Sequence, residues 1–306
     1  MIHRNPTTHD PKQNRPIVFL LSSPRSGSTL LRVMLAGHPS LFCPPELNLL
    51  PYLTMKERDV ALGPCHALQC VDSGCDSRDG LVRAVMALKD TSADQAKEII
   101  GEWTSQNRTI VEVYATLQEL ASPRTLLDKS PMNVAAVEIL KRAEQLFERP
   151  QYIHLVRHPY AVIESLVRHH VDIANASQPE ALAEKYWTIA NSNIFEFLGL
   201  VNANRQHLIR YESLVGNSAE VMKALCAFLG YPFDAAILRP YDGDRMVSGI
   251  RPDSLSVGDP NLLKHQQIEP ELGDVWKKIK LTNRLGALAQ SLASGLLYEI
   301  PNELPG

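Results

Sequence analysis

The chain has 306 residues and a formal net charge of −3, so no global basic field marks it as a nucleic-acid-binding protein. It contains neither a signal-peptide pattern nor an apolar run long enough to span a bilayer, so we expect no membrane partner. Its five cysteines are an odd number in a long chain, which favours reduced thiols in the cytoplasm over a disulfide framework.

This length suits about one to two domains, and no Gly/Ser linker, repeat or low-complexity run divides the sequence. We therefore expect one α/β domain over residues 17–300. Residues 1–16 are polar and interrupted by prolines, which predicts a disordered lead-in, or a linker if the domain was cut from a longer chain. Residues 301–306 form a tail, and residues 55–80, which contain glycines and a proline, are predicted to be a flexible flap region.

Short β-type runs alternate with segments of helical spacing along the chain. Strands are predicted at 17–21, 124–131, 151–159 and 207–215, the last ending in a turn. Helices are predicted at 27–37, 82–89, 94–106, 110–121, 133–147, from Pro159 through Ser165, and at 178–199, 216–229 and 283–297. The prolines of 44–53 exclude a long helix there, and 232–270 is loop-rich. Such alternation predicts a parallel sheet covered on both faces, with ligands at the carboxyl ends of its strands.

The segment IVFLLSSPRSGSTLLRVMLAGHP, residues 17–39, predicts a strand, a tight polar loop and a helix. It differs from the nucleotide-triphosphatase pattern G-x-x-x-x-G-K-[ST], because Ser22 takes the first glycine's place and Ser28 follows Gly27. Backbone N–H groups from Ser26 to Thr29 are expected to face one concavity at a helix N-terminus, which favours an anion. The hydroxyls of this turn and the guanidinium of Arg25 suit phosphate or sulfate oxygens. Taken alone, the segment also fits an ordinary strand–turn–helix.

Four segments occur in an order that resembles the sulfotransferases that use 3′-phosphoadenosine 5′-phosphosulfate. SSPRSGSTLL is similar to the family's phosphosulfate loop, P-[KR]-x-G-[ST]-T, and LLDKSP is similar to its K-[ST]-P turn at Lys129. LVRHPYAVIES resembles the motif in which an arginine, here Arg157, is followed eight residues later by a serine, here Ser165. RYESLV, with Tyr211 and Glu212, resembles the family's YE-x-L strand. The resemblance covers the chain from about residue 17 to 258 and implies a P-loop-like three-layer α/β fold, with a central parallel sheet flanked by helices.

The resemblance also implies how the donor is bound. The nucleotide carries a 5′-phosphosulfate and a separate 3′-phosphate, so it needs two anion sites, one of which Arg157 and Ser165 would supply. No metal is expected to take part, and adenosine 3′,5′-bisphosphate would be the product. Tyr211 and Gly258 are further expected nucleotide contacts. The phosphosulfate site would consist of Arg25, Ser26, Gly27, Ser28 and Thr29.

Two positions near these motifs need comment. Many family members carry a tryptophan where Leu30 stands, so the adenine contact falls to Trp187, Tyr211 or aliphatic packing, although Trp187 is also typical of a core aromatic. Asp128 is the nearest carboxylate to a magnesium-ligand position, and we interpret it instead as a strand-end or capping carboxylate.

A hydroxyl acceptor needs a general base. The stretch DKSPMN after the lysine strand contains no histidine, whereas Glu46, in PPELNLL, matches the position of a glutamate that other sulfotransferases use. We therefore predict Glu46 as the base and Lys129 and Arg25 as cations that stabilise the leaving oxygen. A solvated loop carboxylate is the alternative for Glu46. Of the histidines, His154 is expected to be buried in a strand and His169 and His170 to be solvated on a helix, which leaves His158 and His265 as the reserve candidates for the base.

Longer segments resemble the sulfotransferase domains of cyanobacterial olefin-forming polyketide synthases: SSPRSGSTLLRVMLAGHPSLFCPPELNLLP, YIHLVRHPYAVIES and VGDPNLLKH. In that subgroup the acceptor is a β-hydroxyl of an acyl chain on an acyl carrier protein. A neighbouring thioesterase then releases the acid, which loses carbon dioxide and sulfate to leave a terminal alkene. The resemblance therefore implies a carrier-protein partner, a thioesterase neighbour and a multidomain parent chain. The subgroup often has a histidine where Asn48 stands, so that histidine's role is not transferred.

Two other functions remain open from the residues. One is a stand-alone sulfotransferase acting on a lipid, a carbohydrate or a small alcohol, and the other is a P-loop kinase or nucleotide-binding module, which the missing G-K dipeptide disfavours. The segment CHALQCVDSGC, with Cys65, His66, Cys70 and Cys75, lacks the usual C-x₂-C pairs of zinc sites, so we expect a flexible flap over the acceptor site there.

Overall fold

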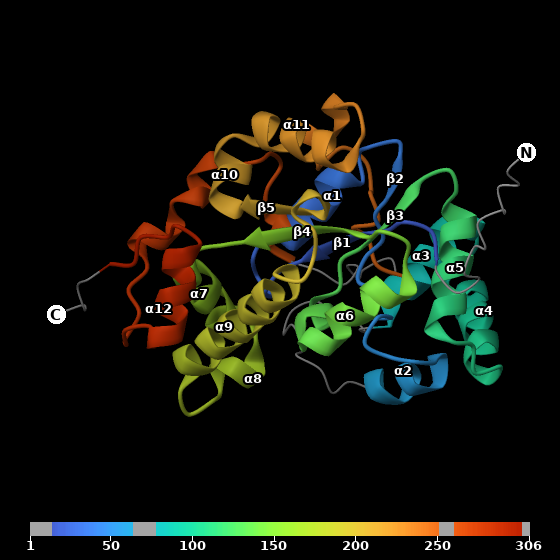
Figure 1. The fold of residues 1–306 in the computed structure, drawn as a ribbon, viewed down its shortest axis with the longest axis horizontal. Helices are drawn as coiled ribbons and strands as arrows, with labels where there is room; N and C mark the ends of the chain where they lie inside the picture. The colour runs from blue at the N-terminus through green and yellow to red at the C-terminus, as the bar shows by residue number, and fades with distance from the viewer. Residues whose placement is uncertain (1–13, 64–77, 251–259, 302–306) are drawn as a thin grey trace, which may run out of the picture.

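A computed structural model describes residues 14–63, 78–250 and 260–301 of the chain. Its centre is a five-stranded sheet in the order β2-β3-β1-β4-β5, in which each neighbouring pair is parallel (Figure 1). The strands are β1 Val18–Leu21, β2 Leu41–Phe42, β3 Thr125–Asp128, β4 Gln151–Val156 and β5 Gln206–Arg210. The predicted parallel sheet is therefore confirmed, and β2 is an additional short strand that the sequence pattern did not indicate.

Helices connect the strands and cover both faces of the sheet (Figure 1). They are α1 Ser28–Leu35, α2 Met55–Leu62, α3 Asp79–Lys89, α4 Ala93–Ser105, α5 Ile110–Ala121, α6 Val137–Leu146, α7 Pro159–His169, α8 Val171–Ala174, α9 Pro179–Leu198, α10 Tyr211–Gly216, α11 Ser218–Leu229 and α12 Ala287–Gly295. Short 3₁₀ turns, among them Pro131–Val134 and Ala203–Arg205, complete the connections.

Two segments differ from the sequence prediction. Residues Met55–Leu62 form helix α2 within the predicted flexible region 55–80, because the Thr54 side chain caps its first turn by accepting a hydrogen bond from Glu57 N. Residues 64–77, which include the cysteine-rich segment, lie outside the described residues. The predicted turn after β5 is instead the short helix α10, which begins directly at the strand end.

Local sequence explains several helix starts. Helices α4 and α5 both begin at capping boxes, formed by Ser92 with Gln95 and by Thr109 with Glu112. Helix α7 begins with Pro159 at its first position, where the missing N–H would have no helical partner.

The alternating side chains of β1 separate the two apolar layers. Phe19 and Leu21 pack in a cluster with residues of α3, α5, α6 and α9 on one face of the sheet. Val18 and Leu20 pack with α1 and α11 on the other face. A third cluster joins α7, α9 and α12 at the β4 side of the molecule. The helices therefore lie in layers on either side of the sheet, which is the expected three-layer arrangement (Figure 1).

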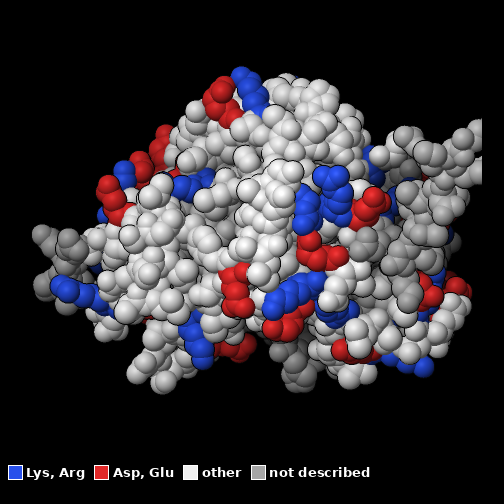
Figure 2. Space-filling view, in the orientation of Figure 1, with Lys and Arg blue, Asp and Glu red and all other residues white. Residues whose placement is uncertain are grey.

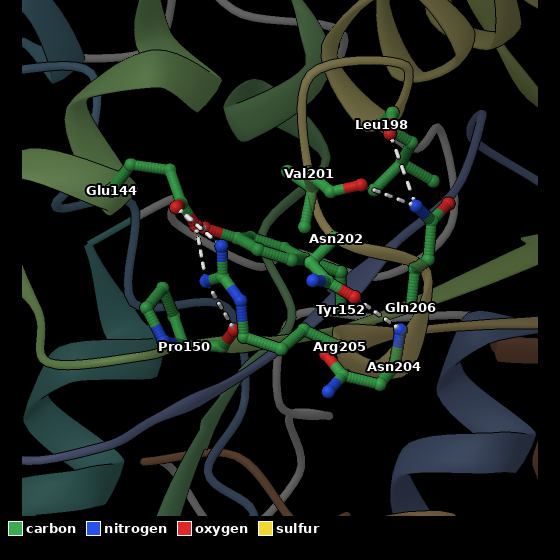
Figure 3. Close-up of polar contacts among 9 residues, drawn as sticks. All are labelled: Glu144, Pro150, Tyr152, Leu198, Val201, Asn202, Asn204, Arg205 and Gln206. Carbon is green, nitrogen blue, oxygen red and sulfur yellow. Dashed lines mark hydrogen bonds and ion pairs between the residues drawn. The ribbon is translucent and has the colours of Figure 1, made fainter.

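Polar contacts brace the amino edge of the sheet. Arg205, just before β5, binds both carboxylate oxygens of Glu144 on α6 at 2.8 and 2.7 Å and the Pro150 carbonyl at 3.2 Å (Figure 3). The Tyr152 hydroxyl of β4 donates to the same carboxylate at 2.7 Å. At this edge Asn14 N donates to Leu146 O, so the last residues of the predicted lead-in are held against α6. Residues 1–13 lie outside the described range.

Charges on the face shown in Figure 2 are of both signs and intermingled, in keeping with the small net charge. Among the described residues, no helix combines the length and apolar character needed to cross a membrane.

Candidate active site

Each of the five strands leads into one of the predicted site residues at the carboxyl edge of the sheet. In the spatial order of the strands, β2 leads to Glu46, β3 to Lys129, β1 to the Arg25 loop, β4 to Arg157 and β5 to Tyr211. Because parallel strands end on the same side, residues far apart in the sequence are collected along one line.

The loop after β1 has a backbone that is unusual at two positions. Arg25 and Gly27 both have left-handed conformations, with φ of 65° and 89°. A Cβ placed on Gly27 would lie 2.4 Å from Cδ2 of the Tyr211 ring, so a glycine is required there for space as well as conformation. Ser26 is fully buried, and its hydroxyl lies 2.7 Å from that of Ser23. Ser28 and Thr29 begin helix α1, which places the predicted anion site at a helix N-terminus.

Arg25 links this loop to the next predicted site. Its Nε donates to the Ser165 hydroxyl of α7 at 2.9 Å, and its carbonyl accepts from Arg157 at 3.1 Å. The Arg157 guanidinium lies 4.3 Å above the centre of the Tyr211 ring. Arg157 also lines the cavity described next, so its guanidinium is placed to meet a ligand anion there. The structure thus brings together the predicted phosphosulfate loop and the predicted 3′-phosphate residues.

A cavity of about 630 Å³ lies against this group. Of the described residues that line it, five carry cationic side chains, and the one carboxylate, Glu164, is paired with Arg168. An excess of positive charge in a concave site favours a ligand that carries several negative charges. Leu30 and Tyr211 belong to the apolar part of the wall. The cationic lining residues are Arg25, Arg157, Arg168, Lys264 and Lys278.

The predicted base and the predicted leaving-group cation are in direct contact. Lys129 Nζ donates to Glu46 Oε1 at 2.6 Å, across 83 positions of sequence. Lys129 is 2% exposed, whereas the Glu46 side chain is 14% exposed and reaches solvent. Within the described part of the chain, Glu46 Oε2 accepts no hydrogen bond. The pair therefore presents one carboxylate oxygen that can accept a proton, beside a fixed cation.

Asp128, the last residue of β3, is fully buried and accepts hydrogen bonds from Tyr114, Ser130 and Asn133. Burial raises the pKa of this carboxyl above its ordinary value. This environment matches the interpretation of Asp128 as a structural strand-end carboxylate.

The structure shows which of the histidines are buried and which line the cavity. His154 is buried in β4, as predicted, with its pKa lowered to about 4 by burial. His158 is wrong as a reserve base, because it is fully buried, stacked on Trp276, and hydrogen-bonded through both ring nitrogens. His170 is buried rather than solvated. His169 and His265 line the cavity.

The structure also reduces the number of residues that could contact adenine. Trp187 is fully buried in the α7–α9–α12 cluster, and its Nε1 donates to Arg157 O at 3.1 Å, so it is a core residue and does not face the cavity. Tyr211 and Leu30 line the cavity instead. Gly258 lies outside the described residues.

Several residues hold the site through contacts that the sequence did not indicate, among them Glu212 of the YE-x-L motif. Glu212 accepts hydrogen bonds from His158 N and from the Tyr298 hydroxyl, so it fixes the exit of β4. Arg32 and Arg58 are buried arginines that bind backbone carbonyls around the Glu46 segment. An arginine within an otherwise apolar helix was the available signal for Arg32, but its long-range carbonyl partners were not visible in the sequence.

Comparisons with known proteins find relatives over most of the chain. The profile described as Sulfotransferase family matches residues 16–235. The nodulation protein NoeE of Sinorhizobium fredii (strain NBRC 101917 / NGR234) is 26% identical over 303 residues, which are 94% of this chain and 66% of that protein. A protein-tyrosine sulfotransferase of Drosophila melanogaster is 22% identical over 87% of this chain and 48% of its own length. The chain thus spans about half to two thirds of these curated relatives.

Two solved structures match over their whole length. The sulfotransferase domain from the curacin biosynthetic pathway is 46% identical, with a TM-score of 0.86, and the match covers 94% of this chain and 100% of that one. The sulfotransferase domain from the Synechococcus PCC 7002 olefin synthase is 43% identical, with a TM-score of 0.85, covering 97% of this chain and 100% of that one.

Proposed function

This chain belongs to the sulfotransferase family, and we propose that it transfers a sulfuryl group from 3′-phosphoadenosine 5′-phosphosulfate to the β-hydroxyl of an acyl chain on an acyl carrier protein. The observation that carries the proposal is the line of strand-end residues. It places a Glu–Lys pair on one side of the Arg25 loop and a cationic cavity on the other.

The residues present fit a donor of this kind. Gly27 packs directly against the Tyr211 ring, and both residues line the cavity beside the N-terminus of α1. Arg157 and Ser165 both line the cavity, and Arg25 contacts both of them. Leu30 and Tyr211 offer apolar surface against which the adenine ring can pack. We assign the 5′-phosphosulfate to residues 25–29 and the 3′-phosphate to Arg157 and Ser165.

The chemistry assigned to the Glu46–Lys129 pair follows from its geometry. Glu46 Oε2 takes the proton from the acceptor hydroxyl as that oxygen forms its bond to sulfur. The bond between sulfur and the bridging phosphate oxygen breaks at the same time, and the leaving group is adenosine 3′,5′-bisphosphate. Lys129 and Arg25 stabilise the negative charge that develops on the bridging oxygen.

The carrier-linked acceptor is supported by the likeness to two sulfotransferase domains whose names place them in the curacin pathway and in an olefin synthase. In this proposal sulfation turns the β-hydroxyl into a good leaving group. A neighbouring thioesterase then releases the acid, which loses carbon dioxide and sulfate to leave a terminal alkene.

The test is intact-mass analysis of a β-hydroxyacyl carrier protein incubated with the chain and the donor, with the same acyl chain on coenzyme A as the matched acceptor. We expect one added sulfo group, gained faster on the carrier protein because docking orients the chain. Equal rates would remove the carrier protein from the proposal. Calorimetric binding of ATP–magnesium in preference to adenosine 3′,5′-bisphosphate would contradict the donor assignment.

A further inference from the structure

Glu46 lies on an irregular segment, residues 43–53, between β2 and α2. Such a backbone has no ladder or helix to satisfy its N–H and C=O groups, so other partners must do so. The segment also contains Asn48 in a left-handed conformation, with φ of 48°. The side chains that bind this backbone therefore determine where the Glu46 carboxylate lies.

Arg58 of helix α2 binds the segment from one side. Its Nε donates to the Asn48 carbonyl at 2.9 Å and its second terminal nitrogen donates to the Leu47 carbonyl at 3.0 Å. The side chain is 2% exposed, so water does not compete for these bonds. A planar guanidinium with several donors can hold two successive carbonyls at once, whereas a lysine ammonium cannot reproduce that fork.

Ser130 binds the same segment from the other side. Its hydroxyl accepts from Asn48 N at 3.0 Å and donates to Asp128 Oδ1 at 2.6 Å. Ser130 directly follows Lys129 in the chain. The turn that carries the cation is therefore tied by one serine to the segment that carries the carboxylate.

Helix α3 packs closely against the main chain of Glu46. A Cβ added to Gly80 would lie 2.0 Å from the Glu46 carbonyl oxygen, so this glycine packs directly against the Glu46 main chain. With Arg58 and Ser130 on the neighbouring residues, the Glu46 backbone is held from three directions.

We propose that Arg58 and Ser130 are positioning residues that hold the Glu46 carboxylate against Lys129 for proton abstraction, a role that rests on the function proposed above. Neither side chain needs to touch the substrate. Catalytic groups must be held within about 0.5 Å of their working geometry, and misplacement by about 1 Å costs on the order of 10²-fold in rate.

The first experiment measures turnover of Arg58→Met with the β-hydroxyacyl carrier protein. We expect kcat to fall by about 10- to 100-fold, with KM for the acceptor and affinity for adenosine 3′,5′-bisphosphate within a few-fold of wild type. Arg58→Lys should recover part of the loss, because one carbonyl regains a donor. Arg205→Met is the matched control: it removes an arginine that binds a carbonyl at the opposite edge of the sheet, and its kcat should stay near wild type (Figure 3).

The second experiment asks whether Arg58 acts through Glu46. If it does, Arg58→Met combined with Glu46→Gln is no slower than Glu46→Gln alone, because the base is already lost. If the two losses multiply, Arg58 acts independently and the proposal is overturned. Should Arg58→Met fail to fold, Ser130→Ala carries the same double-variant test, since it deletes only the link from Asn48 to Asp128.

Amide hydrogen exchange separates this proposal from the proposed function. Exchange in the peptide that contains Asn48 should be faster in Arg58→Met and in Ser130→Ala, and unchanged in Arg205→Met. Unchanged exchange in both Arg58→Met and Ser130→Ala overturns the proposal that these two residues hold the Glu46 segment. A different result is also informative: exchange becomes faster in the variants, but the wild-type chain sulfates no carrier-linked acceptor. That result would reject the proposed function and would leave the contacts of Arg58 and Ser130 with the Glu46 segment as a structural feature.

Discussion

Replacement of Glu46 by glutamine tests the assignment of the general base. The substitution keeps the side chain's shape and its amide oxygen can still accept from Lys129, which lies 2.6 Å from Glu46 Oε1. The stability cost is the difference between a charge-assisted and a neutral hydrogen bond, so it should not exceed about 3 kcal/mol. Loss of a general base slows a reaction by about 10²–10⁴-fold, which is about 2.7–5.4 kcal/mol in activation free energy.

The assay is the initial rate of sulfo-group addition to the β-hydroxyacyl carrier protein, read by intact mass, together with calorimetric affinity for adenosine 3′,5′-bisphosphate. We expect the rate to fall into that range with the affinity nearly unchanged, because Glu46 does not line the cavity to which we assign the donor. Glu144→Gln is the control, since it weakens a comparable ion pair with Arg205 at the amino edge and should lower stability without slowing turnover. A Glu46→Gln rate within a few-fold of wild type would refute the assignment, and His265, which lines the cavity, would become the next candidate.

Three further predictions concern the donor site and the core. Arg157→Ala should weaken the binding of adenosine 3′,5′-bisphosphate by about 1.5–3 kcal/mol and the binding of adenosine 5′-phosphosulfate much less. Equal losses of binding free energy, measured by calorimetry, would show that this arginine does not contact the 3′-phosphate. Gly27→Ala should destabilise the fold by about 1–3 kcal/mol and weaken nucleotide binding more than about tenfold, because its Cβ meets Tyr211 at 2.4 Å. Gly230→Ala, at φ 80° with nothing within 4 Å, should affect only stability, and similar binding losses in both variants would reject the steric explanation. His154 has a pKa of about 4 in the fold against an ordinary 6.5, so the unfolded chain binds more protons between these values. Stability should therefore fall by up to about 3 kcal/mol as pH drops from 6.5 to 4, and urea titrations of His154→Gln should show a flatter pH dependence over that interval.

The sequence by itself determined the features that depend on local patterns. The fully apolar run of β1 predicted a strand buried on both faces, and helical spacing predicted a helix at 110–121, which α5 reproduces. The alternation of strands and helices predicted a parallel sheet, and with it the carboxyl edge at which the site residues gather. These inferences hold because backbone conformation responds mainly to neighbours within a few positions.

The local pattern failed where distant residues decide the environment. Helix α2 forms inside a region that its glycines marked as flexible, and its first residue is held by a distant segment, since Met55 N donates to Arg108 O at 2.9 Å. His158 looked like an available base, but its burial against Trp276 comes from a segment more than a hundred positions later in the chain. Burial of a titratable group depends on what packs over it, and that information is not present in its flanking residues.

Only the tertiary structure decided which side chains touch. Glu46 and Lys129 are 83 positions apart, and Arg25 and Ser165 are 140 positions apart, yet both pairs are in hydrogen-bond contact. The strand order β2-β3-β1-β4-β5 makes neighbours of segments that are not consecutive in the chain. Motif spacing named these residues singly, whereas their pairing depends on strand register and on buried partners such as Arg58, because a hydrogen bond requires atoms to lie within about 3 Å.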